Sequence, residues 1–335
     1  MKLLTIVIPA YNVEAYIDRC LSSMCLDDPA CMDQLEILVV DDGGEDRTGE
    51  IAAGYCERYP ESIFFCHKEN GGHGSVINYG IKRARGRYFK VVDGDDWLNS
   101  RELPGLLDLL AREPADIVAS AYRCVEDESG RLLSVKKPTG CEENYGHAVS
   151  FDSGQVDQVI KMHSMTIKTS LLQGMGQQID EHCFYVDAEY IAYPIPLAKN
   201  VYYDAREIYC YRLGRGGQSM SLKSMQKNHR MHRRVFDSLA AFYERLPDMS
   251  GIRRHYIACC CAQLLENEFQ IYISMGNRFP SIDRLRRFDR GVRLEHPAIY
   301  GATDKKSIRL LRACNYLILP LAYLALRIKK AKAFR

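Results

Sequence analysis

Strand and helix signals alternate at short intervals through the first third of the chain, and this alternation constrains the fold more than any other feature. Short β-branched apolar runs are followed by apolar residues at helical spacing. The predicted strands lie at residues 3–9, 35–40, 63–66, 88–92 and 117–122, and the predicted helices at 13–24, 51–59 and 75–84. Such alternation favours an α/β/α fold in which helices cover both faces of a mostly parallel sheet.

The length of 335 residues suits one large catalytic domain with an appendage. We expect an α/β domain over residues 1–220 and a helical region over 221–335, where two long apolar stripes recur at helical spacing. Hydrophobic residues make up 47% of the chain, enough for a sizeable core. The formal net charge is only +2, so the sequence predicts no nucleic-acid partner.

The thirteen cysteines do not form a recognisable disulfide or zinc pattern. Their number is odd, no Cys-x-x-Cys pair occurs, and no signal peptide precedes the first predicted strand. Three consecutive cysteines at 259–261 fall within a helical stripe, where thiols behave as small apolar side chains. We therefore expect reduced cysteines and a cytoplasmic protein.

Polar and glycine-rich segments follow four of the predicted strands. In an open sheet, ligands bind beyond the carboxyl ends of the strands, so these segments are expected to meet at one edge. The segments are residues 9–12 (PAYN), 41–44 (DDGG), 70–74 (NGGHG) and 93–97 (DGDDW). Each one alone is typical of an ordinary turn, but their coincidence at one edge predicts a binding site.

The segment after the fourth strand concentrates negative charge. Asp93, Asp95 and Asp96 stand within four residues, and their mutual repulsion is unfavourable unless a cation is present. Carboxylates suit Mg²⁺ or Mn²⁺, which fill their other positions with water and phosphate oxygens. A phosphorylated ligand is therefore expected, although neither a Walker motif nor a Gly-x-Gly-x-x-Gly turn after the first strand occurs.

Four motifs together resemble the inverting glycosyltransferase family 2. They are IVIPAYN from Ile6, VVDDGGED from Val39, NGGHGSVINYGI from Asn70 and VVDGDDW from Val91, and their order and spacing also fit. The resemblance covers about the first 220 residues. It implies the GT-A fold, a Rossmann-like α/β/α sandwich that holds a nucleoside-diphosphate sugar.

The resemblance also implies roles for individual residues. Tyr11 would lie against the nucleotide base and Asp41 would accept a hydrogen bond from a uracil-type imide. Asp93 would face the ribose, and Asp95 would bind the metal ion as part of the DxD motif, while the role of Asp96 is left open. The implied nucleotide-sugar-binding residues are Pro9, Ala10, Tyr11, Asp41, Asn70, Gly72, Asp93, Gly94, Arg212 and Ser219.

An inverting transfer requires a base that takes the proton of the acceptor hydroxyl. The resemblance places this base at Asp187, within FYVDAEY, where the family usually carries Glu-Asp and this chain has Val186 before the Asp. Glu189 remains the alternative. Downstream, a loop of the family brings an Arg and a Ser to the donor diphosphate, which implies Arg212 and Ser219 for these roles, with Arg215 as a further candidate.

Two further positions need separate interpretations. The Arg that commonly precedes the motif Asn is Ile77 here, so one expected contact to the donor is missing. His73 lies between glycines, and it is either a ligand of a phosphate or sugar hydroxyl or a surface group. Trp97, the single tryptophan, is read either as a packing residue or as a platform for the sugar.

The last residues of the chain combine an apolar run with a basic tail. Residues 313–326 are almost entirely apolar, and five cations follow by residue 335. The run is too short to span a bilayer and contains Pro320. The pattern fits peripheral attachment of residues 313–335 to the inner face of the cell membrane, with a docked helix hairpin as the alternative.

The leading hypothesis is an inverting glycosyltransferase that uses Mn²⁺ or Mg²⁺. It would move a sugar from a nucleoside-diphosphate sugar, with UDP expected, to a glycan or lipid-linked acceptor in surface or cell-wall polysaccharide synthesis. Two alternatives remain: a nucleotidyltransferase on a related fold, and a catalytically silent membrane-associated protein that binds nucleotide sugars.

Overall fold

A single ten-stranded sheet organises the first part of the chain. The computed structural model describes residues 2–215, 219, 221–275 and 279–324. The strand order is β3-β2-β1-β4-β9-β6-β10-β5, with β7 paired to β6 and β8 paired to β10. The strands are β1 (Leu4–Ala10), β2 (Leu35–Asp41), β3 (Ile63–His67), β4 (Tyr88–Val91), β5 (Trp97–Leu98), β6 (Ile117–Glu126), β7 (Leu132–Lys136), β8 (Ala148–Ser150), β9 (Met165–Lys168) and β10 (Asn200–Leu213).

The strands β3, β2, β1 and β4 run parallel to one another, as the alternating pattern predicts. Beyond β4 the sheet is mixed, because β9 pairs antiparallel with both β4 and β6, and only β6 and β10 are parallel there. The carboxyl ends of β1, β2 and β4 therefore meet at one edge, and the polar segments that follow them are neighbours.

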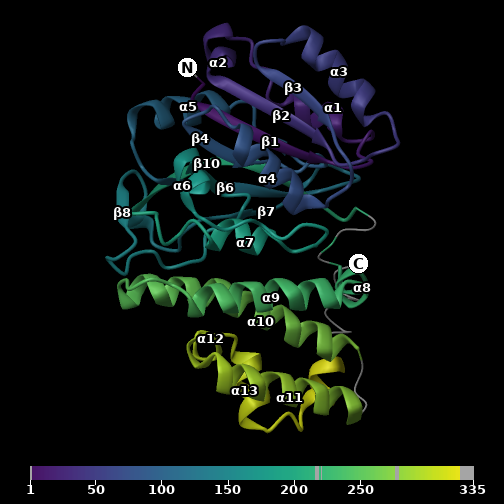
Figure 1. Cartoon of the computed structure of the whole chain (residues 1–335), viewed down its shortest axis with the longest axis vertical. Helices are drawn as coiled ribbons and strands as arrows, with labels where there is room; N and C mark the ends of the chain where they lie inside the picture. Colours follow the sequence, from purple (N-terminus) through teal and green to yellow (C-terminus); the bar gives the residue numbers. More distant parts are fainter. Residues whose placement is uncertain (1, 216–218, 220, 276–278, 325–335) are drawn as a thin grey trace. The chain divides into compact units, whose positions relative to one another are not determined.

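Helices cover both faces of the parallel strands (Figure 1). They are α1 (Ile17–Ser22), α2 (Pro29–Gln34), α3 (Thr48–Arg58), α4 (His73–Arg83), α5 (Leu103–Arg112), α6 (Thr169–Gly174) and α7 (Asp187–Ala192). Leu4, Ile6 and Ile8 share a buried core with α1, α3 and α5. Val7 points to the other face, where α4 approaches so closely that a Cβ on Gly80 would lie 2.4 Å from Val7 Cγ2.

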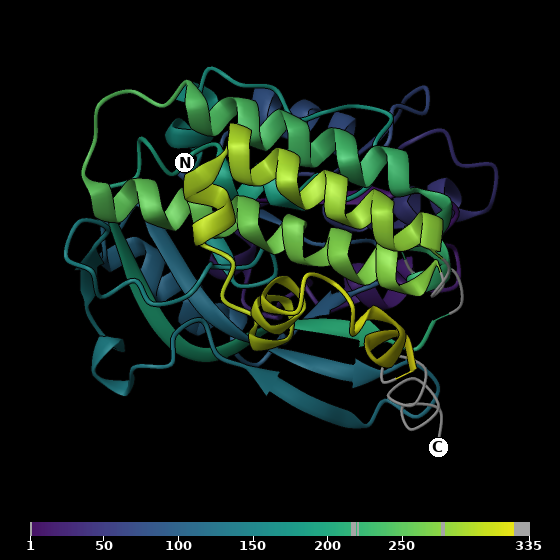
Figure 2. The ribbon, with the colours of Figure 1, turned by 90° about the horizontal axis from the view of Figure 1, so that it is seen from below.

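The chain divides into two compact units, Met1–Gly216 and Gly217–Arg335. The second unit is helical, and α10 packs against both α9 and α11 (Figure 2). Its helices are α8 (Leu222–Lys227), α9 (His229–Glu244), α10 (Gly251–Ser274), α11 (Phe279–Glu295), α12 (Pro297–Gly301) and α13 (Lys306–Ala313). The apolar stripes of the sequence thus fall on α9 and α10, as predicted.

Buried polar contacts join the helices of the second unit. Glu268 on α10 is fully buried and lies 2.8 Å from His229 Nε2 and 2.6 Å from His232 Nδ1, both on α9. Asp289 on α11 accepts two hydrogen bonds from the guanidinium of Arg312 on α13. No helix among the described residues is both long and apolar enough to cross a membrane. The basic tail of the predicted membrane segment, 327–335, lies outside the described residues.

Candidate active site

The acidic turn that follows β4 is held against the end of β1. The backbone N–H of Gly94 donates to the carbonyl oxygen of Pro9 at 3.0 Å, and that of Asp96 donates to the carbonyl of Asp93 at 2.9 Å. A Cβ at position 94 would lie 3.0 Å from the same Pro9 oxygen, so glycine allows this close approach. The turn is therefore fixed at the edge where the sequence predicts a binding site.

Asp96 ties the turn to β10. Its side chain is 2% exposed, and its two carboxylate oxygens accept hydrogen bonds from the Tyr209 hydroxyl at 2.6 Å and the Arg212 backbone N–H at 2.7 Å. Burial, followed by the charges of Asp95 and Asp93, raises the pKa of Asp96 well above its ordinary value. Asp96, whose role the sequence left open, thus anchors the turn.

Asp93 forms a pair with His73, the first residue of α4. His73 Nε2 lies 2.8 Å from Asp93 Oδ1. Burial acts to raise the pKa of Asp93 and to lower that of His73, but the hydrogen bond and charge between them outweigh burial in both cases. The pKa of Asp93 is therefore lowered and that of His73 is raised, which favours the charged form of each.

Asp95 faces Arg215, whose Nε lies 3.3 Å from Asp95 Oδ2. Burial and the charge of Asp93 raise the pKa of Asp95. Arg212, the residue implied for the diphosphate, is only 6% exposed; its Nε donates to the Asp95 carbonyl at 2.7 Å and its Nη1 to Asp127 at 2.8 Å. In this structure Arg212 therefore braces the turn from within the protein.

Trp97 packs against two guanidinium groups rather than facing solvent. The side chain is 8% exposed, with Arg19 3.6 Å and Arg212 4.9 Å from the ring centroid. These are cation–π distances. Of the two interpretations that the sequence allows for Trp97, the structure supports packing.

The predicted nucleotide pocket lies at the ends of β1 and β2. Tyr11, directly after β1, is 53% exposed and available to a ligand, whereas Ala10 is buried in the strand and pairs with Asp41. Asp41 Oδ1 accepts from the Gly44 N–H at 3.0 Å, and Asp41 Oδ2 lies 2.8 Å from His67 Nδ1. Each of these carboxylate oxygens keeps a further lone pair for a ligand.

Asp42 organises the glycine-rich loop, a role that sequence reasoning did not assign. Its buried carboxylate accepts hydrogen bonds from the N–H groups of Gly71 at 2.9 Å and Gly72 at 2.7 Å, and from Lys68 Nζ at 2.7 Å. The Asn70 side-chain amide donates to the Asp42 carbonyl at 2.8 Å. Asp42 therefore fixes the loop that precedes α4 and, through it, His73.

A segment from much later in the chain docks on this loop. Asn78 on α4 donates to the Ile179 carbonyl at 2.8 Å and accepts from the Ile179 N–H at 3.1 Å. A Cβ at Gly74 would lie 2.1 Å from the Asp180 carbonyl oxygen, so the contact requires glycine. The following residues include Tyr185 in left-handed backbone conformation, with φ of 71°, just before α7.

The structure separates the two candidate bases, both on α7. Glu189 is fully buried, where it accepts hydrogen bonds from the Asp180 N–H at 2.7 Å and the Tyr193 hydroxyl at 3.1 Å. Asp187 is exposed, yet the surrounding protein still raises its pKa, with a further contribution from Asp93 that is opposed by His73. Only Asp187 of the two is therefore accessible to an acceptor, and it lies within range of the charges of the acidic turn.

His163 is a further residue of the site, and sequence reasoning missed it. It precedes β9, and its ring lies against Tyr122, Tyr209 and Tyr211, with centroids 5.0, 4.9 and 4.4 Å away. Burial lowers its pKa to about 4, so the imidazole is neutral at pH 7. No motif marks this position in the sequence.

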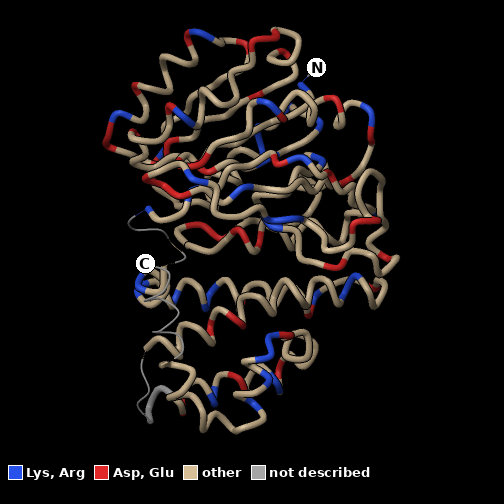
Figure 3. The backbone as a smooth tube through the Cα atoms, turned by 180° about the vertical axis from the view of Figure 1, so that it is seen from behind, with Lys and Arg blue, Asp and Glu red and all other residues tan. Residues whose placement is uncertain are grey.

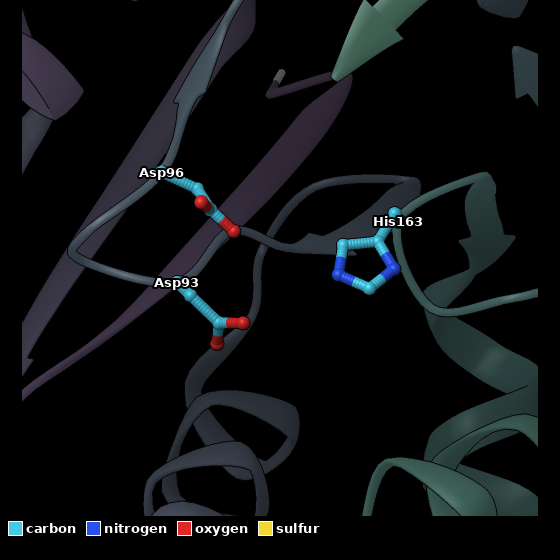
Figure 4. Close-up of side chains that lie close together, drawn as sticks. All are labelled: Asp93, Asp96 and His163. Carbon is cyan, nitrogen blue, oxygen red and sulfur yellow. The ribbon is translucent and has the colours of Figure 1, made fainter. Parts of the chain in front are cut away.

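Among the described residues, Asp93, Asp96 and His163 form a group that could hold a metal ion. One ligand atom from each lies within 4.8 Å of the others, and Figure 4 shows both carboxylates beside the imidazole. Nε2 of His163 faces the carboxylates, and Nδ1, on the other side of the ring, is buried without a hydrogen-bond partner. Two carboxylates and a neutral imidazole are ligands that a divalent transition metal accepts, so these residues fit such an ion. Asp95 is not part of this group, and Ser219 belongs to the second unit.

The comparisons with known proteins agree with this architecture. The sequence model of glycosyl transferase family 2 matches residues 5–175, slightly more than half of the chain. The glycosyltransferase EpsJ of Bacillus subtilis is 39% identical over 122 residues, which cover 36% of this chain and 34% of EpsJ. The minor teichoic acid biosynthesis protein GgaB of the same organism is 29% identical over 146 residues, which cover 40% of this chain and 16% of GgaB.

The fold is also similar to solved structures. The crystal structure of S. aureus TarS 1-349 in complex with UDP-GlcNAc matches with a TM-score of 0.67 at 20% identity, over 97% of this chain and 92% of that one. The fold is therefore GT-A. The chain belongs to glycosyltransferase family 2, and it spans about a third or less of the length of relatives such as EpsJ and GgaB.

The paired charges of His73 and Asp93 predict a pH-dependent contribution to stability. The pKa of His73 is raised from 6.5 on folding, so the stabilisation is present below pH 6.5 and is lost as the pH rises through the folded-state value. The pKa of Asp93 is lowered from 3.8, so the stabilisation also fades as the pH falls through that lowered value. We expect wild type to exceed His73→Gln in stability most clearly between about pH 4 and 6.5.

Thermal or urea unfolding of both proteins across pH, with a chelator present, measures this difference. Asp108→Asn, on the exposed surface of α5, serves as a charge control. A stability difference that stays constant from pH 5 to pH 9 would show that the pair does not titrate as described.

Proposed function

We propose that the protein transfers a sugar, with inversion, from a nucleoside-diphosphate sugar to a hydroxyl group of a glycan or lipid-linked acceptor. The observation that carries this proposal is the position of Asp187. It is the accessible carboxylate of α7, and its pKa responds to the charges of both His73 and Asp93. A carboxylate within electrostatic range of the turn at which the donor is expected to bind supports the role of base for Asp187.

The nucleotide end of the donor would bind at the edge formed by Pro9, Ala10 and Tyr11. The exposed ring of Tyr11 is free to stack on a base, and Asp41 retains acceptor capacity for an imide N–H. A hydrogen bond from an imide N–H to Asp41 favours UDP as the nucleotide. TarS, which has a similar fold, was crystallised with UDP-GlcNAc. Asn70, Gly72, Asp93 and Gly94 would line the ribose and sugar side of the same edge.

The diphosphate would bind between the acidic turn and the loop after β10. A divalent ion, Mn²⁺ or Mg²⁺, would neutralise both the diphosphate and the carboxylates, with Asp95 as the ligand that the DxD resemblance implies. Arg215, whose Nε lies 3.3 Å from Asp95 Oδ2, is one proposed contact of this diphosphate, and Arg212 and Ser219 are the others. These positive charges would stabilise the departing nucleoside diphosphate.

The chemistry proposed for Asp187 is a single displacement. Its carboxylate takes the proton of the acceptor hydroxyl while that oxygen forms a bond to the anomeric carbon. The bond between the anomeric carbon and the diphosphate oxygen breaks at the same time, and the electron pair leaves with the nucleoside diphosphate. The raised pKa of Asp187 makes it a stronger base than an ordinary aspartate.

The donor site predicts a metal-dependent gain in stability with nucleotide. At about one hundred times its Kd, UDP with Mn²⁺ should stabilise the native protein by about 2.7 kcal/mol, a shift of several degrees in Tm. Asp95→Ala should lose most of this shift, whereas Asp108→Ala on the exposed surface of α5 should keep it. A thermal-shift screen of nucleoside diphosphates and nucleotide sugars, with and without Mn²⁺, makes the measurement.

Equal shifts with Mn²⁺ and with a chelator would contradict the metal dependence. A shift with another nucleoside diphosphate but none with UDP would reassign the base while leaving the diphosphate site in place.

Mutations of the two carboxylates of α7 should have different effects, one on the transfer rate and the other on stability. Asp187→Asn should lower the transfer rate by about 10²–10⁴-fold while retaining the thermal shift with UDP, because it removes the base and not a donor contact. Glu189→Gln should lower stability, because it alters a fully buried carboxylate with two donors, but the folded fraction should still transfer sugar. Nucleotide release coupled to acceptor glycosylation gives the rate.

Loss of transfer in folded Glu189→Gln together with full activity in Asp187→Asn would overturn the assignment of the base.

The acceptor is proposed to be part of a surface or cell-wall polysaccharide or its lipid-linked precursor. GgaB takes part in minor teichoic acid biosynthesis, which places one relative in this process. The chain covers only 34% of EpsJ and 16% of GgaB, so the acceptor of this protein is inferred from the class of process and not from either protein as a whole.

The end of the second unit is proposed to contact an anionic membrane surface on the cytoplasmic side. Leu310, Leu317, Leu321 and Leu324 are 55%, 76%, 66% and 54% exposed. Figure 3 shows Lys and Arg along the helices of this unit, and the sequence adds a basic tail. Exposed apolar side chains together with cations favour anionic lipid.

We expect the protein to sediment with vesicles that contain anionic lipid and not with purely zwitterionic vesicles. Leu317→Glu combined with Leu321→Glu should abolish this binding, whereas Leu294→Glu, at a 71% exposed leucine of α11, should leave it unchanged. Equal recovery of the double variant and wild type with anionic vesicles would contradict the proposed surface.

A further inference from the structure

We propose that the divalent ion of the donor site takes a nitrogen ligand from His163. This inference rests on the proposed function, because it concerns the ion that accompanies the nucleotide. It adds to the acidic turn a ligand from the loop before β9, far away in the sequence. The ion would then have a mixed oxygen and nitrogen environment rather than one of carboxylates, phosphate and water alone.

The side chains of Asp93, Asp96 and His163 lie close to one another. Ligand atoms of Asp93, Asp96 and His163 all lie within 4.8 Å of one another (Figure 4). An ion about 2.1 Å from each ligand holds opposite ligand atoms about 4.2 Å apart. Small side-chain adjustments therefore suffice to bring all three into contact with one ion.

Each of the three side chains has an electron pair available. Asp93 gives Oδ1 to His73, which leaves Oδ2. The carboxylate oxygens of Asp96 each accept one hydrogen bond, from Tyr209 and from the Arg212 backbone, and each retains a second lone pair. The imidazole of His163 turns Nε2 toward the two carboxylates, whereas Nδ1 lies on the far side of the ring (Figure 4). A neutral imidazole with its proton on Nδ1 leaves the Nε2 lone pair for an ion.

The surroundings of His163 fix the direction of its ring. The ring stacks on Tyr122 and meets the edge of Tyr209, with centroids 5.0 and 4.9 Å away. Lys90 on β4 is fully buried, and its Nζ donates to the carbonyls of His163 at 2.9 Å and Met165 at 3.2 Å. The buried Lys90 side chain thus holds the backbone at His163 and at the start of β9, which makes Lys90 a positioning residue for this ligand.

The donor set has a consequence for ion selectivity. Imidazole is a ligand that transition metals bind well, whereas Mg²⁺ prefers oxygen. We therefore expect Mn²⁺ to bind more tightly than Mg²⁺ in the presence of UDP, and we expect His163→Phe to reduce this preference. Phe preserves the aromatic contacts with the tyrosines and removes both nitrogens.

Pulsed electron paramagnetic resonance of Mn²⁺ bound to the full chain with UDP tests the proposal, because it detects a nitrogen atom coordinated to the ion. The wild-type spectrum should contain ¹⁴N modulation, and this modulation should change in protein labelled with ¹⁵N-histidine. His163→Phe should lose it and weaken Mn²⁺ binding by about tenfold or more. His73→Asn, which alters the other histidine of the site, should retain it.

The labelled wild-type protein keeps the test decisive even if His163→Phe does not fold. Mn²⁺ binding without histidine nitrogen coupling would overturn this proposal and leave the metal-dependent function standing. Nitrogen coupling that disappears in His73→Asn but persists in His163→Phe would identify His73 as the ligand. That result would also overturn the proposal. A failure of Mn²⁺ to bind with UDP would overturn both this proposal and the metal dependence of the proposed function.

Discussion

Three carboxylates within four residues create a repulsion around which the catalytic unit is organised. Asp96 is buried, and its carboxylate accepts hydrogen bonds from the Tyr209 hydroxyl and the Arg212 backbone N–H. Asp93 is paired with His73, and Asp95 faces Arg215. Each carboxylate thus has a different partner, and these partners come from α4, from β10 and from the loop after β10. The turn consequently joins elements that are distant in sequence, and it remains acidic enough to attract a cation.

The same charges connect the acidic turn to Asp187, the proposed base. Asp42 fixes the glycine-rich loop through the N–H groups of Gly71 and Gly72, and that loop presents His73 to Asp93. The segment before α7 packs on the same loop, and this packing brings Asp187 within range of the His73 charge. A change in the ionisation of the acidic turn would therefore shift the pKa of Asp187, although no covalent or hydrogen-bonded chain between them is required.

Much of the parallel half of the fold could be predicted from the sequence, because its strands and helices repeat regularly and each contributes to one core. The motif residues at the ends of β1, β2 and β4 were placed at one edge for the same reason. The antiparallel insertion of β9 could not be foreseen, since a strand of four residues carries no periodic signal. His163 was missed because its role arises only when β9 brings the preceding loop beside the turn. The engagement of Arg212 with Asp127 likewise depends on pairing between β10 and β6, which spacing does not reveal.

In the proposed mechanism, a donor held at the acidic turn is attacked from the side of Asp187. The stereochemistry of transfer to water tests this geometry without knowledge of the natural acceptor. Proton NMR of the sugar released from a bound nucleotide sugar, recorded before mutarotation, identifies the anomer that forms first. The account predicts that this anomer has the configuration opposite to that of the donor. Release of the anomer with the donor's configuration would contradict a single displacement assisted by Asp187.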